Sequence, residues 1–173
     1  AIFIYNDTLI MLDILVREND KWRAIEVKSS LSLSETYYQD AALQYYVLNG
    51  CNVPICDIQL MYINSEFIKE GEIDIKKLFV FKSVKDYAEQ QLDSIDKKVN
   101  ELKNVINLNN APKINIGTQC FNPYTCEFKG HCWKKIPNDS FLHTNAYSDK
   151  ELFSLYNSGI QDNREFKKII DPL

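Results

Sequence analysis

The sequence predicts an α/β fold in which helices flank a mixed β-sheet. Residues 9–16 are nearly all apolar and residues 22–27 end in an alternating run, so both segments are predicted to be strands. Asn19 and Asp20 lie between them, and these residue types are preferred at the centre of a two-residue turn. The pattern therefore indicates a hairpin, which an amphipathic helix and a further apolar strand follow.

The amphipathic helix is predicted over residues 34–49, with Ser34 as its N-cap and Gly50 as its stop signal. Residues spaced three and four apart form its buried stripe, which consists of Tyr38, Ala41, Ala42, Tyr45 and Leu48. The later predicted elements are a strand at 55–63, a short helix or loop at 65–77, an extended segment at 78–81, an amphipathic helix at 83–108, a linker at 109–117 and a last helix at 148–158 that Ser148 caps.

The composition is typical of a globular domain, with 45% hydrophobic residues, 25% charged residues and only five Gly and five Pro. The chain is long enough for one well-formed core. We expect a core over residues 1–110, a cysteine module over residues 111–136, and a helical extension over residues 137–173 that leads into a downstream domain. No signal peptide and no run of about eighteen apolar residues is visible, so a cytoplasmic protein with no membrane partner is expected.

The hairpin turn brings two carboxylates together. With the turn at residues 19–20, Asp13 faces Glu26. Two carboxylates with Cβ atoms roughly 5 Å apart repel each other, and a divalent cation between them removes that repulsion. Strand alternation places Lys28 on the same face as Glu26, while Val27 points the other way. Two oxygen ligands beside one ammonium group suit Mg²⁺ or Mn²⁺ and the hydrolysis of phosphate esters.

Two plainer interpretations stay open at this point. Glu26 and Lys28 could lie on the solvated face of an antiparallel hairpin, because the pattern they form is short. Gln44, which lies one turn after Asp40 on the helix, could occupy a partly exposed face and need no function.

Asp13, followed by the Glu26-Val27-Lys28 triplet and by a helix that carries Gln44, resembles the PD-(D/E)XK nucleases and, among them, the RecB-like branch. The resemblance implies a restriction-endonuclease-like core and metal-dependent, exonuclease-like hydrolysis of DNA in repair or defence. It implies that Asp13, Glu26 and the main-chain carbonyl of Val27 hold Mg²⁺ or Mn²⁺. It also implies that Lys28 positions the attacking water and that Gln44 steadies Lys28 or a phosphate. Single-stranded DNA or duplex ends are the implied substrates.

Residues 26–30 and 40–44 also resemble an uncharacterised bacterial family of RecB-like proteins. The proteins of that family carry a further domain downstream. The RecB-like branch usually places a Tyr four residues after its Gln, where this chain has Leu48. Family cores also begin with a helix before the first strand. Because the chain begins at Ala1 in an apolar run, we expect it to be a fragment without that helix. The alternative class is an inactive nuclease-like scaffold that binds protein or DNA.

Cys120, Cys126 and Cys132 are equally spaced among aromatic residues, Pro123 and Gly130. Clustered thiolates select zinc or an iron–sulfur cluster, whereas a disulfide scaffold would need an oxidising compartment. Three thiolates do not complete a four-coordinate site. Iron–sulfur RecB-like nucleases carry three trailing cysteines and one leading cysteine. The resemblance therefore implies a 4Fe-4S cluster in the full-length protein, incomplete in this chain, with zinc as the alternative.

The net charge of −4 and the pI of about 5.2 argue against indiscriminate nucleic-acid binding. A local groove could still use basic and aromatic side chains. The candidate contacts to nucleic acid are Tyr45, Tyr46, Lys129, Lys134 and Lys135, with core packing as the alternative for the two tyrosines.

Overall fold

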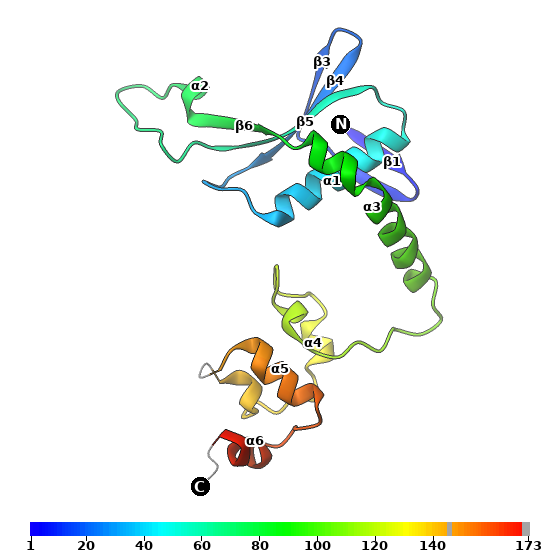
Figure 1. Ribbon diagram of the computed structural model, residues 1–173, viewed down its shortest axis with the longest axis vertical. Helices are drawn as coiled ribbons and strands as arrows, with labels where there is room; N and C mark the ends of the chain where they lie inside the picture. The colour runs from blue at the N-terminus through cyan, green and yellow to red at the C-terminus, as the bar shows by residue number, and fades with distance from the viewer. Residues whose placement is uncertain (145–146, 171–173) are drawn as a thin grey trace. The chain divides into compact units, whose positions relative to one another are not determined.

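The computed structural model describes residues 1–144 and 147–170, and it divides the chain into two units, Ala1–Asn109 and Asn110–Leu173 (Figure 1). The first unit holds two sheets. A two-stranded antiparallel sheet consists of β1 (Ile2–Tyr5) and β2 (Thr8–Met11). A four-stranded sheet has the order β3-β4-β5-β6, with β3 (Ile14–Glu18), β4 (Lys21–Lys28), β5 (Ile55–Ile63) and β6 (Phe79–Ser83). Only β4 and β5 in it are parallel, so the mixed sheet expected from the sequence is confirmed.

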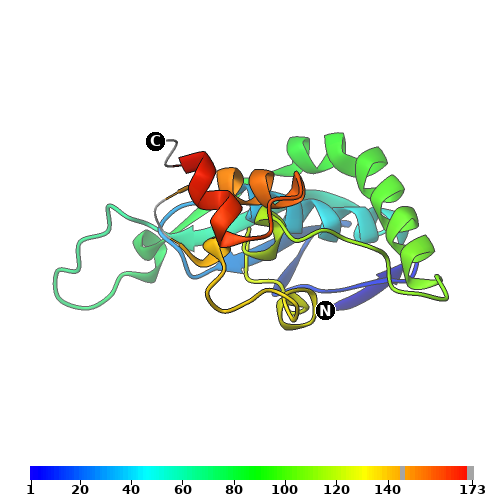
Figure 2. The ribbon, with the colours of Figure 1, turned by 90° about the horizontal axis from the view of Figure 1, so that it is seen from below.

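Helix α1 (Glu35–Gly50) connects the two parallel strands, because a parallel pair needs a crossover between its members. Helix α3 (Lys85–Ile106) follows the short α2 (Ile75–Leu78) and β6, and it packs on the same side of the strands as α1 (Figure 2). The side chains of the core that lose all exposure come from both layers: Ala24, Ile58 and Leu60 from the sheet, and Ala41, Ala42, Val47, Leu48 and Ala88 from the helices. The predicted stripe of α1 is buried apart from Tyr38, which is half-buried.

The strand predicted over residues 9–16 is interrupted, and the two halves belong to different sheets. The Leu12 amide donates to the Ala1 carbonyl at 2.8 Å, and the Ala1 amino group donates to the Leu12 carbonyl at 3.0 Å. Leu12 therefore still belongs to the β1–β2 hairpin, whose turn residues Asn6 and Asp7 have φ of 48° and 57°. Asp13 is the residue at which the chain leaves one sheet for the other.

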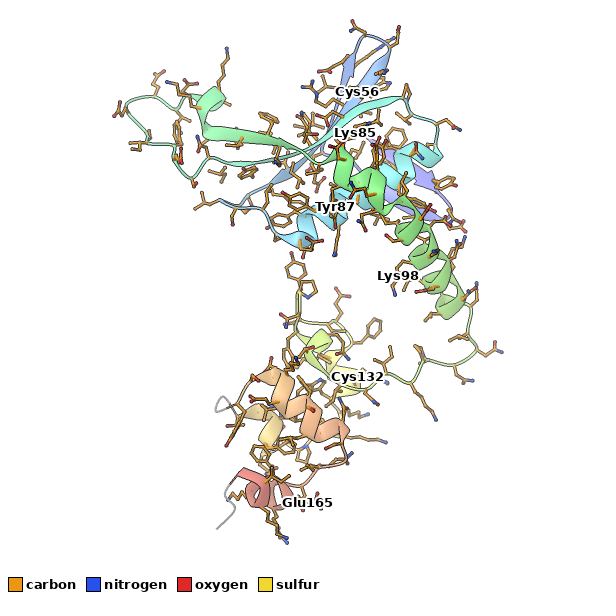
Figure 3. All side chains as sticks on the ribbon, in the orientation of Figure 1. Cys56, Lys85, Tyr87, Lys98, Cys132 and Glu165 are labelled. Atoms are coloured by element: carbon orange, nitrogen blue, oxygen red, sulfur yellow. The ribbon has the colours of Figure 1, made fainter. Side chains whose placement is uncertain are left out.

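Helix α3 packs its apolar residues against the core along most of its length but not over its last turns. Val84 and Ala88 are buried at its start, and Tyr87 lies against α1, where its ring centroid is 5.4 Å from that of Tyr38 (Figure 3). Leu102 is 51% exposed and Ile106 is 80% exposed. The periodicity therefore identifies the helix, and its stripe packs against the core as far as Val99 but not over the last turns.

The second unit contains α4 (Lys129–Cys132), α5 (Asp149–Asn157), α6 (Asn163–Ile170) and two 3₁₀ turns, Thr118–Cys120 and Phe141–His143. One core unites its parts and consists of Ile116, Cys120, Trp133, Phe141, Leu142, Leu152, Phe153 and Phe166. Residues 111–136, expected as a cysteine module, and residues 137–170, expected as a helical extension, thus share one core. The rest of that extension, residues 171–173, lies outside the described residues. The Ser148 cap is present as a capping box with Glu151, whereas α6 was missed by the sequence prediction.

Within residues 1–144 and 147–170, no helix combines the length and the apolar character that a membrane span requires.

Replacing Leu60 by Ala tests the core of the first unit. Leu60 is fully buried, so the lost contacts and the cavity should lower the free energy of unfolding by about 2–5 kcal/mol. Leu102→Ala is the matched control, because its exposed side chain predicts a change within about 0.5 kcal/mol. Urea denaturation followed by circular dichroism measures both, and equal effects of the two substitutions would contradict the assigned core.

Candidate active site

The β3–β4 hairpin has the register that a turn at residues 19–20 predicts. Its ladder runs from Glu18 opposite Lys21 to Ile14 opposite Ile25, and Asn19 adopts φ of 54° at the turn. The ladder ends one pair before the predicted Asp13–Glu26 pair, because the chain switches sheets at Asp13. The sequence prediction that Asp13 and Glu26 pair directly across the two strands is therefore corrected: the ladder stops before them.

Asp13 still reaches the strand that carries Glu26. Its Oδ2 accepts a hydrogen bond of 2.8 Å from the Val27 amide, so the side chain replaces the backbone acceptor that a continued ladder would supply. The amide and carbonyl of one strand residue project to the same edge. The Val27 carbonyl therefore lies on the edge of β4 that Asp13 occupies, one residue beyond Glu26.

Glu26 is a buried carboxylate with a separate donor for each oxygen. Lys28 Nζ donates to Glu26 Oε1 at 2.7 Å, and Gln44 Nε2 donates to Glu26 Oε2 at 2.7 Å. Glu26 is 8% exposed and Gln44 is 5% exposed. Neither residue lies on a solvated face, so the solvent-facing positions that the two plainer interpretations assumed for them are excluded. Gln44 contacts the carboxylate directly rather than steadying Lys28.

Asp40 joins this cluster and was assigned no role from the sequence. Lys28 Nζ donates to Asp40 Oδ2 as well as to Glu26, and it lies 5.2 Å from the centroid of the Tyr37 ring. Asp40 precedes Gln44 by one helical turn, so both side chains project from the same face of α1 toward β4. The i, i+4 spacing of two polar residues beside a buried stripe was the signal that could have identified Asp40.

The electrostatics follow from this arrangement. Burial raises the pKa of Glu26, and the hydrogen bonds from Lys28 and Gln44 oppose that rise only in part. Burial alone would lower the pKa of Lys28, but its hydrogen bonds to Asp40 and Glu26 outweigh this effect and raise the pKa above its usual 10.5. Lys28 is therefore a cation at neutral pH, suited to orient water or a phosphate rather than to remove a proton.

The donor set fits a hard divalent cation in kind. Mg²⁺ commonly binds one or two carboxylates and completes its shell with water and substrate phosphates, and Asp13, Glu26 and the Val27 carbonyl supply such oxygens. In the described part of the chain, no three His, Cys, Asp or Glu side chains stand together as a metal-binding group. The Gln44 Oε1 atom is buried without a hydrogen-bond partner. It can therefore accept a hydrogen bond from a polar ligand beside Glu26.

Tyr45 and Tyr46 are not available as stacking surfaces for bases. Their exposures are 7% and 5%, and their hydroxyls donate to Glu89 at 3.1 Å and to Asp96 at 2.7 Å. Both side chains connect α1 to α3 in the core. The prediction that they contact nucleic acid is therefore corrected.

The three equally spaced cysteines lie in the second unit. Cys120 is buried, Cys126 is half-buried and Cys132 is exposed (Figure 3), and the Cys126 amide donates to the Cys120 carbonyl at 3.0 Å. Their thiols are suitable in kind for zinc or an iron–sulfur cluster, but three thiols are one ligand short of a four-coordinate site. They are not gathered into a metal-binding group within the described residues.

The basic candidates of the second unit differ in exposure. Lys129 is half-buried, with its Nζ 4.2 Å from the Phe121 ring centroid and 5.2 Å from that of Trp133. This lysine is held by aromatic faces, whereas Lys134 and Lys135 are exposed.

Comparisons of the chain with models of protein families, with curated proteins and with solved structures found no match.

The raised pKa of Glu26 predicts a pH dependence of stability. A carboxyl with a raised pKa in the folded state contributes stability that is fully present below its unfolded value of 4.5 and is lost as the pH rises through the folded value. The free energy of unfolding of the wild type, relative to that of Glu26→Gln, should therefore fall as the pH rises from 4.5. Urea denaturation at a series of pH values measures the difference, and a difference that is flat or rises with pH would refute the assignment.

Proposed function

We propose that this chain is a nuclease that uses Mg²⁺ or Mn²⁺ to hydrolyse DNA phosphodiester bonds. The observation that carries the proposal is the buried Glu26 carboxylate, which accepts hydrogen bonds from both Lys28 and Gln44. Asp13 lies nearby, where its side chain accepts a hydrogen bond from the Val27 amide. A carboxylate buried beside a lysine and a second acidic residue supports a site for phosphate chemistry. The assignment is supported by the chemistry of this site and not by similarity to a known protein.

Each residue has a role that follows from its contacts. Asp13, Glu26 and the Val27 carbonyl would hold the cation, which when bound would polarise the phosphate and acidify a water molecule. Lys28 would place its positive charge against the phosphate oxygens as negative charge develops on them. Gln44 would keep the Glu26 carboxylate oriented through its hydrogen bond to Oε2.

Cleavage assays on single-stranded and duplex DNA with Mn²⁺ test this proposal. Lys28→Ala and Glu26→Gln should each lower the cleavage rate by roughly a hundredfold or more, because each removes a charged group from the site. Lys98→Ala and Glu101→Gln are the matched controls, since both side chains are 67% exposed on α3. Lys98 is labelled on this helix in Figure 3. Both variants should cleave at the wild-type rate. Wild-type cleavage by Lys28→Ala would place the activity elsewhere or in a contaminant.

We also propose that the three cysteines of the second unit supply thiolate ligands to a 4Fe-4S cluster, with zinc as the alternative. The support is the donor type and the equal spacing of Cys120, Cys126 and Cys132. Strictly anaerobic isolation should give a brown protein with about four irons per chain. A colourless protein with one tightly bound zinc would overturn the iron–sulfur assignment.

An inactive scaffold is the second candidate function. It is favoured by the engagement of Lys28 with both Glu26 and Asp40, since a structural ion-pair network has the same contacts. The cleavage assay separates the two candidates, because a scaffold would bind DNA or protein without metal-dependent cleavage.

A further inference from the structure

Lys28 has two carboxylate partners from two different elements. Glu26 on β4 is 11% exposed in its side chain, whereas Asp40 on α1 is 40% exposed. A single carboxylate would neutralise the lysine, so the second one is not required for charge balance. The Asp40 carboxylate faces solvent, whereas the Glu26 carboxylate faces the core. The two partners of Lys28 therefore differ in their access to water and ions.

The hydrogen bonds of Glu26 compete with the binding of a metal ion to the same carboxylate. Its Oε1 accepts from Lys28 and its Oε2 accepts from Gln44, so a divalent cation at Glu26 would have to share an oxygen that already carries an ammonium group. Two cations at one oxygen repel strongly in a buried site. Lys28 must therefore weaken or leave its contact with Glu26 when a metal ion binds there.

Asp40 is placed to keep the displaced ammonium inside the site. Its neighbours Ala41 and Ala42 are fully buried, so the turn of α1 that carries Asp40 is held against the sheet. The Tyr37 ring, 5.2 Å from Lys28 Nζ, offers the ammonium a further favourable contact. Without Asp40, a lysine expelled from Glu26 would extend into solvent and its charge would leave the reacting phosphate.

We propose that Asp40 is a positioning residue that retains Lys28 when Glu26 takes a divalent metal ion. This inference rests on the proposed function, because it requires Glu26 to be a metal ligand. Lys28 pairs with both Glu26 and Asp40 in the metal-free protein, and in the metal-bound protein it would keep Asp40 as its carboxylate partner. Asp40 acts through Lys28 and contacts neither metal nor substrate.

Calorimetric titration with Mn²⁺ tests the proposal in a cycle of four proteins: wild type, Lys28→Met, Asp40→Asn and the double variant. Lys28→Met removes the competing cation, so Mn²⁺ should bind about tenfold more tightly. Asp40→Asn leaves Lys28 with Glu26 as its carboxylate partner, so Mn²⁺ should bind about tenfold more weakly. In the Lys28→Met background Asp40→Asn should have almost no effect, because there is no lysine for Asp40 to hold.

The cycle also identifies failure. Equal weakening by Asp40→Asn in both backgrounds would mean that Asp40 acts on the metal directly, and it would overturn the inference while leaving the proposed function intact. A wild-type protein that binds no Mn²⁺ would overturn both. Asp93→Asn, an exposed carboxylate on α3, is the control for general loss of negative charge and should leave Mn²⁺ affinity unchanged.

Amine labelling provides a measurement that does not need the Lys28→Met protein to fold. Acylation of lysines, read by mass spectrometry and normalised to exposed Lys98, reports whether Lys28 is held. Saturating Mn²⁺ should leave Lys28 protected in the wild type and should raise its labelling about tenfold in Asp40→Asn. An equal rise in both proteins would show that Asp40 does not retain the lysine.

Discussion

The burial of the Glu26 carboxylate is the constraint on which the first unit depends. A carboxylate taken out of water is strongly destabilising unless donors satisfy it, and here Lys28 and Gln44 each supply one. Lys28 lies on the same strand and Gln44 on the helix that follows. The polar cluster therefore joins β4 to α1 at a defined position.

The position of Asp13 follows from a second constraint, the exchange of partners between two sheets. Leu12 completes the β1–β2 hairpin, and Ile14 begins the pairing of β3 with β4. Asp13 lies between them, where the Val27 amide would otherwise lack an acceptor. The Asp13 side chain supplies that acceptor, so one residue both ends a ladder and brings a carboxylate to the strand of Glu26 and Lys28.

The second unit has a different kind of core. Aromatic side chains dominate it, and Trp133 lies in edge contact with Phe121 and Phe153 at centroid distances of 5.5 and 5.9 Å. Cys120 is buried in the same cluster, whereas Cys132 is exposed. The three cysteines thus occupy three environments despite their equal spacing, because spacing in a loop does not determine which side chain the aromatic core encloses.

Local pattern alone determined some elements of this protein, although it missed α6 and the separation of β2 from β3. Alternation, helical periodicity and the Asn19–Asp20 turn were sufficient for β5, for α1 and for the β3–β4 register, since each depends on neighbours in sequence. The Asn6–Asp7 turn offered the same signal and was overlooked. The tertiary structure alone decided that Asp13 leaves the ladder, that Gln44 is buried and that Asp40 shares Lys28. These contacts join residues of separate elements, and their geometry depends on how α1 packs on the sheet rather than on any spacing within it.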